Sequence, residues 1–202
     1  MRHQSTTPDP GEEARTSAAK DTLAPLMAAI RGGSQSALGQ LMDLCWPELV
    51  RYAARQVGDL DLARDIVQET LIQIWERRRA WEPRGSVRAY LYRIVRNLVI
   101  DEKRRQGVRR RWAAGQELAP SPRPATPDEV LDEQLLTEVF ETAVAALPDR
   151  RREVFELVFM RGLSHADAAT VMGLSVQTVA NQMSHALRSV RKAVTDSGTL
   201  EG

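Results

Sequence analysis

A proline-rich stretch from Gly107 to Pro127 constrains the fold of this chain more than any other feature of the sequence. It contains Pro120, Pro122 and Pro124 as well as Pro127, and it has few apolar residues. Proline lacks a backbone N–H and restricts the residue before it, so such a stretch favours neither a helix interior nor a central strand. We therefore expect an extended, flexible linker between two separately folded domains.

This linker, residues 107–127, divides the 202-residue chain into domains at 23–106 and 128–194. Residues 1–22 are polar and lack apolar periodicity, which predicts a disordered N-terminal arm, and residues 195–202 form a tail. Within both domains apolar residues recur at three- and four-residue spacing, and aromatic residues make up only 5% of the chain. The sequence therefore predicts an all-α protein of two small helical domains.

The composition excludes several classes of site. Cys45 is the only cysteine, which excludes an intramolecular disulfide and any zinc site that needs two thiolates. No apolar run approaches the roughly 20 residues of a spanning helix, and the first residues lack the apolar core of a signal peptide. We therefore expect a cytoplasmic protein without membrane insertion, and we assign it no metal, no cofactor and no catalytic residues.

The small net charge of +1 hides a strong segregation of charge along the chain. Residues 77–112 carry 13 Lys and Arg against 3 Asp and Glu, whereas residues 43–76 carry 3 against 7. Residues 117–156 carry 4 against 10. A basic block between acidic ones favours one face for a polyanion and another for a protein partner.

The basic block contains a predicted helix with an unusual exposed side. Behind a capping Ser86, the apolar residues fall on one stripe, while Arg93, Arg96, Asn97 and Arg104 fall on another face. Cations with interleaved aromatic residues suit single-stranded nucleic acid, because phosphates attract the cations and unpaired bases stack on the rings. The alternative is a solubilising arginine face over an aromatic core.

The preceding helix is predicted after the turn at 58–61, and it has an acidic outer side. Asp65, Gln68 and Glu69 lie away from its apolar stripe. These residues either form an ordinary solvated face or contact a protein partner.

The second domain contains the pattern of a helix-turn-helix. Ser164 with Asp167 has the spacing of a capping box and begins a short helix, Gly173 permits a sharp turn, and Ser175 caps a longer helix from Val176. A helical hairpin that serves packing alone is the alternative.

The longer helix exposes polar groups suited to DNA. Amide and hydroxyl groups at its start can bond base edges in a major groove, and cations farther along suit phosphates. The base-edge candidates are Gln177, Thr178, Asn181 and Gln182, and the phosphate candidates are Arg188, Arg191 and Lys192. His185 is either a phosphate contact or an ordinary surface histidine.

These residues together carry a family resemblance. Trp-Glu-Arg-Arg at 75–78, Arg-Ala-Tyr-Leu-Tyr-Arg-Ile-Val-Arg-Asn-Leu at 88–98, and Asp101 with Arg104-Arg105 resemble the second conserved region of extracytoplasmic-function (ECF) sigma factors of the sigma-70 family. Leu147-Pro148 through Lys192 resembles the fourth region. The likeness covers about 23–194 in the family's order.

The resemblance implies a sigma factor that binds core RNA polymerase and directs promoter-specific initiation. It implies contacts with the clamp helices of the largest catalytic subunit and with the flap, and it implies promoter DNA as a partner. Residues implicated in core binding are Asp65, Gln68, Glu69 and Ile72. Residues implicated at the minus-ten element are Arg78, Trp81, Arg93, Arg96, Asn97, Arg104 and Arg105. Residues implicated at the minus-thirty-five element are Ser175, Gln177, Thr178, Asn181, Gln182, His185, Arg188, Arg191 and Lys192.

The resemblance also implies an anti-sigma factor as a partner, since such sequestration is common in the family. The recognition helix departs from many members, which have Lys or Arg at positions matching Ala180, Gln182 and Leu187. Its sequence is similar to that of iron-citrate-type regulators of the family.

Two other functions fit parts of the sequence. A stand-alone helix-turn-helix regulator would bind duplex DNA tightly without polymerase, but the first domain has no evident ligand pocket. A nucleic-acid-processing enzyme would need a phosphate-binding loop, a metal cluster or a nucleophile elbow, and the sequence contains none of these motifs.

Overall fold

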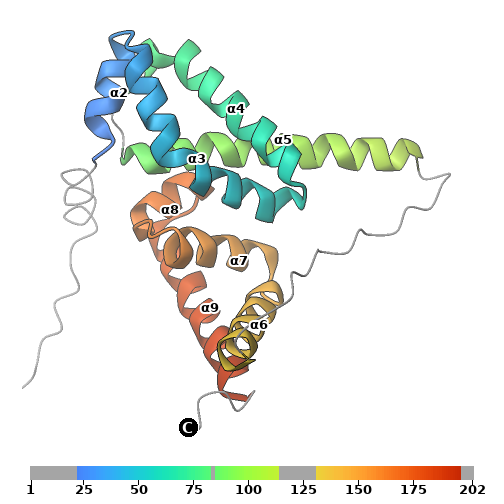
Figure 1. Ribbon diagram of the computed structural model, residues 1–202. Helices are drawn as coiled ribbons and strands as arrows, with labels where there is room; N and C mark the ends of the chain where they lie inside the picture. Colours follow the sequence, from blue (N-terminus) through green and yellow to red (C-terminus); the bar gives the residue numbers. More distant parts are fainter. Residues whose placement is uncertain (1–21, 83–84, 114–130, 197–202) are drawn as a thin grey trace, which may run out of the picture. The chain divides into compact units, whose positions relative to one another are not determined.

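The computed structural model describes residues 22–82, 85–113 and 131–196, and these residues form helices and loops without a strand (Figure 1). The all-α prediction is therefore confirmed. The described residues form two compact units, one with residues 22–82, 85–113 and 170–173 and the other with residues 131–169 and 174–196. Most of the expected N-terminal arm, the linker from 114 to 127 and the end of the tail lie outside the described residues.

The first unit is a small bundle in which the longest helices pack pairwise. Its elements are α2 (Ala24–Arg31), α3 (Gln35–Val57), α4 (Leu60–Glu76), the short 3₁₀ turn η1 (Arg78–Ala80) and α5 (Val87–Ala113). Helices α3, α4 and α5 each contact the other two, and α2 packs on α3. Every helix of this group can therefore bury an apolar stripe against a neighbour.

Local capping signals set the helix ends in this unit. The Ser34 hydroxyl accepts from the Ala37 N–H at the start of α3, and the Asp59 carboxylate accepts from two N–H groups at the start of α4. Ser86 caps α5 as the sequence predicts, since its hydroxyl accepts from the Ala89 N–H at 3.1 Å. Between α3 and α4, Gly58 has the left-handed conformation (φ 76°) that favours glycine.

Two tyrosines form the centre of this core. Tyr52 of α3 and Tyr92 of α5 are fully buried, and their rings meet edge to face with centroids 5.1 Å apart. Aliphatic side chains from the three long helices surround them, among them Leu41, Leu49, Val67, Ile74, Leu91 and Val95. This core fixes which side of α4 and of α5 is left for other contacts.

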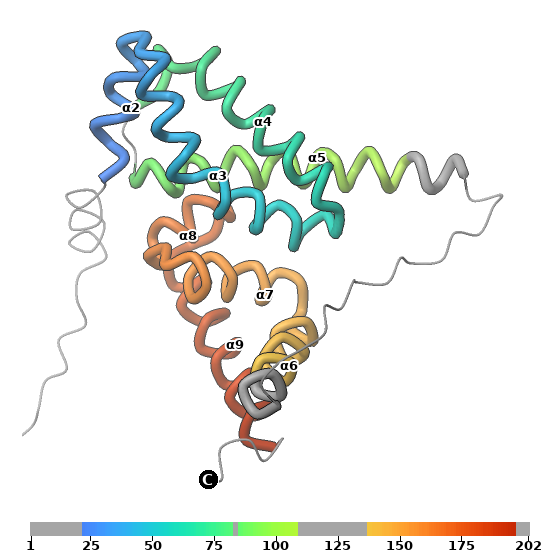
Figure 2. Tube along the Cα trace, in the orientation of Figure 1, coloured from blue at the N-terminus to red at the C-terminus, as the bar shows by residue number. Residues whose placement is uncertain are grey.

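Helix α3 changes direction along its length (Figure 2). It contains Pro47, which has no N–H to bond the carbonyl one turn earlier and whose ring crowds that carbonyl. The helix nevertheless continues on both sides of this proline, from Gln35 to Val57. Helix α2 was not predicted, because it is short and buries only Met27 and Ile30 from within its own span.

Helix α5 corrects the predicted start of the linker. It continues through Gly107 to Ala113, into the segment expected to be extended. One glycine costs a helix about 1 kcal/mol relative to alanine, and the flanking Arg and Gln residues are good helix formers. Glycine alone therefore did not end this helix, and the linker begins later than predicted.

The second unit consists of shorter helices around α9 (Val176–Asp196). The others are α6 (Leu131–Ala145), α7 (Asp149–Phe155), the π-helical turn η2 (Glu156–Met160) and α8 (His165–Met172), of which residues 165–169 belong to this unit. Both α6 and α7 pack on α9. Helix α9 supplies the buried stripe Val179, Met183, Ala186 and Val190.

Three phenylalanine rings of this unit lie together at η2, and Phe159 among them is 56% exposed. Phe155 is fully buried, and its ring stacks on Phe159 with centroids 4.9 Å apart, while Phe140 lies 6.1 Å from it. Glu156 and Arg161 form an ion pair of 2.9 Å, with side chains 4% and 9% exposed, respectively. Removing one partner would leave a buried charge, so this pair holds η2 in place.

The predicted helix-turn-helix is present with its predicted signals. The Ser164 hydroxyl accepts from the Asp167 N–H and donates to the Asp167 carboxylate, at 3.0 and 2.9 Å. Gly173 adopts φ 65° between the two helices, and the Leu174 N–H closes the turn on the Ala169 carbonyl. The Ser175 hydroxyl then caps α9 by accepting from the Thr178 N–H at 3.1 Å.

We predict that Gly173→Ala lowers the free energy of unfolding of the protein by about 1–2 kcal/mol, because an L-residue is strained at positive φ. Gly39 is the matched control, since it lies inside α3 with open space around its Cα. Gly39→Ala should raise stability by up to about 1 kcal/mol. Urea denaturation followed by circular dichroism checks both, and equal stability of the two variants would contradict the role of the turn.

Candidate nucleic-acid interface

The outer face of α4 combines acidic and apolar side chains. Asp65, Gln68 and Glu69 are exposed, and Ile72 is 46% exposed, at the spacing that keeps all four on one face. Glu69 accepts a hydrogen bond of 3.0 Å from Gln73 one turn later. An isoleucine within an acidic face is better suited to a protein partner than to a polyanion.

The outer face of α5 has the opposite character. Arg93, Asn97 and Arg104 are exposed and Arg96 is half-buried, while Leu91 lies in the core. The predicted cation and amide face is therefore accessible and not sealed inside the fold. It attracts phosphates and offers one amide for a base.

The two arginines farther along α5 are only loosely held. Arg104 lies 3.6 Å from Asp101 and Arg105 lies 3.6 Å from Glu102, and both arginine side chains are more than 70% exposed. Such exposed pairs contribute roughly 0–1 kcal/mol. A phosphate can therefore replace these carboxylates at little cost.

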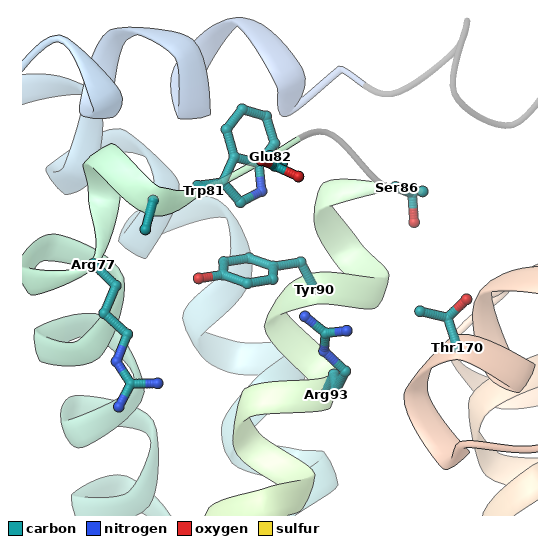
Figure 3. A pocket seen from close by; sticks show the side chains of 9 residues that line it. Arg77, Trp81, Glu82, Ser86, Tyr90, Arg93 and Thr170 are labelled. Carbon is teal, nitrogen blue, oxygen red and sulfur yellow. The ribbon is translucent and has the colours of Figure 1, made fainter.

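A hollow lies beside the start of α5, and the residue pattern did not predict it. Its lining residues come from the end of α4, η1, the loop after it and the first turns of α5, and include Arg77, Trp81, Glu82, Tyr90 and Arg93. In Figure 3 the Tyr90 ring projects from α5 below Trp81, and Arg93 lies next to it. The Arg93 guanidinium lies 5.8 Å from the centre of the Tyr90 ring.

This hollow joins ring faces, cations and one carboxylate. Aromatic faces stack on bases, cations bind phosphate or base oxygens, and a carboxylate accepts from base N–H groups. Tyr90 is half-buried and lines the hollow. The hollow therefore has the chemistry to accept an unpaired base.

Two predicted site residues are held by local structure. Arg78 donates to the Trp75 carbonyl at 2.6 Å, and its guanidinium lies 4.2 Å from the centre of the Trp75 ring. Trp81 is only 9% exposed. Arg78 thus caps the end of α4, and Trp81 lines the hollow although most of its side chain is buried.

A polar contact between α3 and α5 stabilises the start of α5, where the hollow lies. Arg88 forms an ion pair with Glu48, and the Tyr92 hydroxyl donates to the same carboxylate at 3.4 Å. Burial lowers the pKa of Arg88, but the negative charge of Glu48 outweighs it, and the net pKa lies above the usual arginine value. The guanidinium therefore stays charged and ties the first turn of α5 to α3.

The predicted face of α9 is also accessible. Ser175, Gln177, Asn181 and His185 are exposed, and Thr178 and Gln182 are half-buried. The cations farther along the helix are exposed as well, namely Arg188, Arg191 and Lys192. The structure thus brings all nine predicted residues to the start and outer side of one helix.

Two hydrogen bonds connect the amides of this face. Gln177 donates to Asn181 at 3.0 Å, and the Arg151 Nε donates to the Gln182 Oε1 at 3.3 Å. Arg151 belongs to α7, and sequence reasoning missed it because the two residues are far apart in the chain. The run Arg150-Arg151-Arg152 was the available signal, but it did not indicate which arginine turns toward α9.

Comparison with known families agrees with this arrangement. The model of sigma-70 region 2 matches residues 41–109, and that of sigma-70 region 4 matches residues 137–190. The ECF RNA polymerase sigma factor SigL of Mycobacterium tuberculosis is 33% identical over 174 residues, which span 82% of this chain and 96% of that protein. The chain belongs to the ECF RNA polymerase sigma factors.

Solved structures of sigma factors share the fold. The sigma factor RpoE of Bartonella quintana, in complex with the anti-sigma factor NepR, is similar with a TM-score of 0.62 and 25% identity over 78% of this chain and 96% of that chain. CnrH, in complex with the cytosolic domain of CnrY, is similar with a TM-score of 0.59 and 26% identity over 85% and 96%.

The described residues of this sigma factor contain neither a candidate metal site nor a candidate membrane span. Within residues 22–82, 85–113 and 131–196, no cluster of His, Cys, Asp and Glu is arranged to hold a metal ion. In the same ranges no helix combines the length and apolar character needed to cross a bilayer.

We predict that Arg78→Ala lowers the free energy of unfolding of the first unit by about 1–2 kcal/mol, because it loses both the carbonyl bond and the contact with the Trp75 ring. Arg79 is the matched control, as an exposed neighbour in the same turn. Arg79→Ala should change stability by less than about 0.5 kcal/mol. Urea denaturation measures both, and indistinguishable midpoints would contradict the capping role of Arg78.

Proposed function

We propose that this chain associates with core RNA polymerase and directs it to promoters through one DNA-binding face on each unit. The observation that carries the proposal is the match of regions 2 and 4, in the family's order, to units that each expose a polar helix face. The chain supplies selectivity, and the polymerase performs the chemistry.

The α4 face is the proposed contact with the clamp helices of the largest subunit. Its carboxylates at Asp65 and Glu69 would pair with cations of the partner, and Ile72 would be covered on docking. Gln68 lies between them on the same face. The flap is the proposed contact of the second unit.

The α5 face and the hollow beside it are the proposed site for the minus-ten element. Arg93, Asn97 and the half-buried Arg96 would hold the unpaired strand, while Arg104 and Arg105 bind its phosphates. Base contacts of roughly 1–3 kcal/mol each would offset the cost of opening the duplex. Arg78 and Trp81 would contribute by shaping the hollow.

The α9 face is the proposed reader of the minus-thirty-five element. Ser175, Gln177, Thr178, Asn181 and Gln182 lie where a recognition helix meets base edges. The outer cations and His185 would contact phosphates, which position the helix without reading sequence.

Control of such a factor would come from a second protein. We propose an anti-sigma partner, since RpoE and CnrH, both similar in fold, form complexes with NepR and CnrY. We place the chain in the cytoplasm, where its polymerase works. We also propose that the chain is near the iron-citrate-regulator-like subgroup, and this assignment rests on the short sequence of the recognition helix.

The test is reconstitution. The purified chain should bind core polymerase, and the complex should initiate on promoters that core polymerase alone ignores. Free chain should bind duplex DNA weakly. Tight, sequence-specific duplex binding without polymerase, together with no association with core, would favour the stand-alone regulator instead.

We predict that Glu69→Lys weakens association with core polymerase at least about tenfold, because it places a cation on the docking face. Asp43→Lys is the matched control, with the same charge change on an exposed position of α3. Binding is measured by fluorescence anisotropy of labelled chain. The docking assignment fails if both variants bind core equally well.

We predict that Asn97→Ala lowers promoter opening by about fivefold or more while core binding stays unchanged, because it loses a contact made only with the open strand. Gln40→Ala truncates an exposed amide on α3 and should match the unchanged chain. Permanganate reactivity of unpaired thymines reports opening, and a parallel loss of core binding would contradict the assignment.

We predict that Arg191→Ala weakens duplex binding of the holoenzyme across all sequences, with a salt slope shallower by about 0.9. Gln177→Ala should instead change the preferred base at one minus-thirty-five position, since it removes a base-edge contact. Salt titrations on a duplex library separate the two effects. A sequence-selective effect of Arg191→Ala would contradict the division between positioning and reading.

A further inference from the structure

An arginine outside the recognition helix holds one of its amides. Arg151 lies on α7 and Gln182 on α9, both are half-buried, and these two helices pack together within the second unit. The Arg151 Nε donates to the Gln182 Oε1 at 3.3 Å. The amide of Gln182 therefore has a fixed partner on the protein side.

The chemistry of arginine fixes the orientation of this amide. A guanidinium has five N–H donors and no acceptor, so only the oxygen of Gln182 can face it. The Nε2 group must then point away from Arg151. An amide that usually offers both an acceptor and a donor is left to present mainly its donors.

This orientation changes which base the side chain can read. A glutamine with both groups available pairs with adenine, accepting from N6 and donating to N7. The Gln182 oxygen keeps a second lone pair, but it cannot turn to face adenine N6 without losing its bond to Arg151. Guanine instead offers two neighbouring acceptors, O6 and N7, to the Nε2 donors. The base with two acceptors is then favoured over the base with one.

We propose that Arg151 is a positioning residue that sets the base preference of Gln182 to guanine in the minus-thirty-five element. The inference rests on the proposed role of α9 as the reader of that element and assigns one base contact within it. Arg151 acts through the amide of Gln182 rather than on the base.

The other amide pair on the helix provides a contrast. Gln177 donates to Asn181, and both partners carry an acceptor and a donor. That pair can reverse its direction when DNA arrives, so its preference is not set in advance. Only Gln182 has a partner that is limited to donation.

The experiment uses the full chain assembled with core polymerase and a promoter library randomised over the minus-thirty-five element. Transcripts are counted by sequencing for the unchanged chain, Gln182→Ala, Arg151→Ala, Arg151→Lys and Arg150→Ala. Gln182→Ala identifies the contacted position as the one where base preference disappears. Arg150 is the matched control, because it is an exposed arginine beside Arg151 with the same charge.

At that position the unchanged chain should prefer guanine over adenine by about fivefold or more. Arg151→Ala should bring the ratio to about one or reverse it, because the released oxygen accepts from adenine N6. Arg151→Lys should keep the preference, since lysine is also only a donor. Arg150→Ala should lower transcription at most uniformly across the library.

The same guanine-to-adenine ratio in the unchanged chain and in Arg151→Ala would overturn the inference, as would a Gln182→Ala variant with unchanged preference everywhere. Circular dichroism and unchanged preferences at the other positions establish that each variant is folded. Failure of the unchanged chain to initiate on any library member would instead contradict the proposed function itself.

Discussion

The burial of one apolar stripe on each helix determines everything that the molecule presents to its partners. Helix α5 turns Leu91, Val95 and Val99 into the first unit, and this leaves Arg93 and Asn97 outside. Burying a charged guanidinium without a partner costs far more than a single aliphatic contact contributes, so the helix cannot rotate to hide its cations. In the second unit, the buried stripe of α9 exposes its amides in the same way. The interface is therefore a consequence of core packing.

The two exposed faces have different chemistry, and each suits the form of DNA that we propose it meets. An unpaired strand offers ring faces and phosphates. The hollow of the first unit is lined by Tyr90, whose ring can stack on a base, and by Arg93, whose charge can bind a phosphate. A duplex offers donor and acceptor groups in its major groove, and the amides at the start of α9 in the second unit can bond to such groups. Neither unit needs a reactive group for these tasks. A sigma factor shifts equilibria of binding and opening, and its energetics are those of many weak contacts.

The sequence predicted those features that depend on neighbours in the chain. The Ser164, Ser175 and Ser86 caps and the Gly173 turn are set within three or four residues, so they could be predicted. The exposed faces followed from helical periodicity. The end of α5 was misplaced because one glycine does not outweigh the strong helix formers around it.

Contacts between helices could not be predicted from local residue spacing. The bond from Arg151 to Gln182 and the hollow around Tyr90 join segments whose proximity depends on packing. Arg78 was assigned to DNA by resemblance, but its bonds to Trp75 give it a local structural role. Residue spacing thus predicted which helix faces are exposed, but it did not predict the contacts between helices that hold the side chains of those faces in place.

The central claim is that both units grip one promoter at the same time while they are mounted on the polymerase. The most direct measurement varies the number of base pairs between the two promoter elements and follows transcription by the reconstituted holoenzyme. Because a half-turn of DNA is about 5 base pairs and moves one element to the opposite side of the helix, inserting that length should reduce initiation at least about tenfold. Initiation that is indifferent to this insertion would contradict the account.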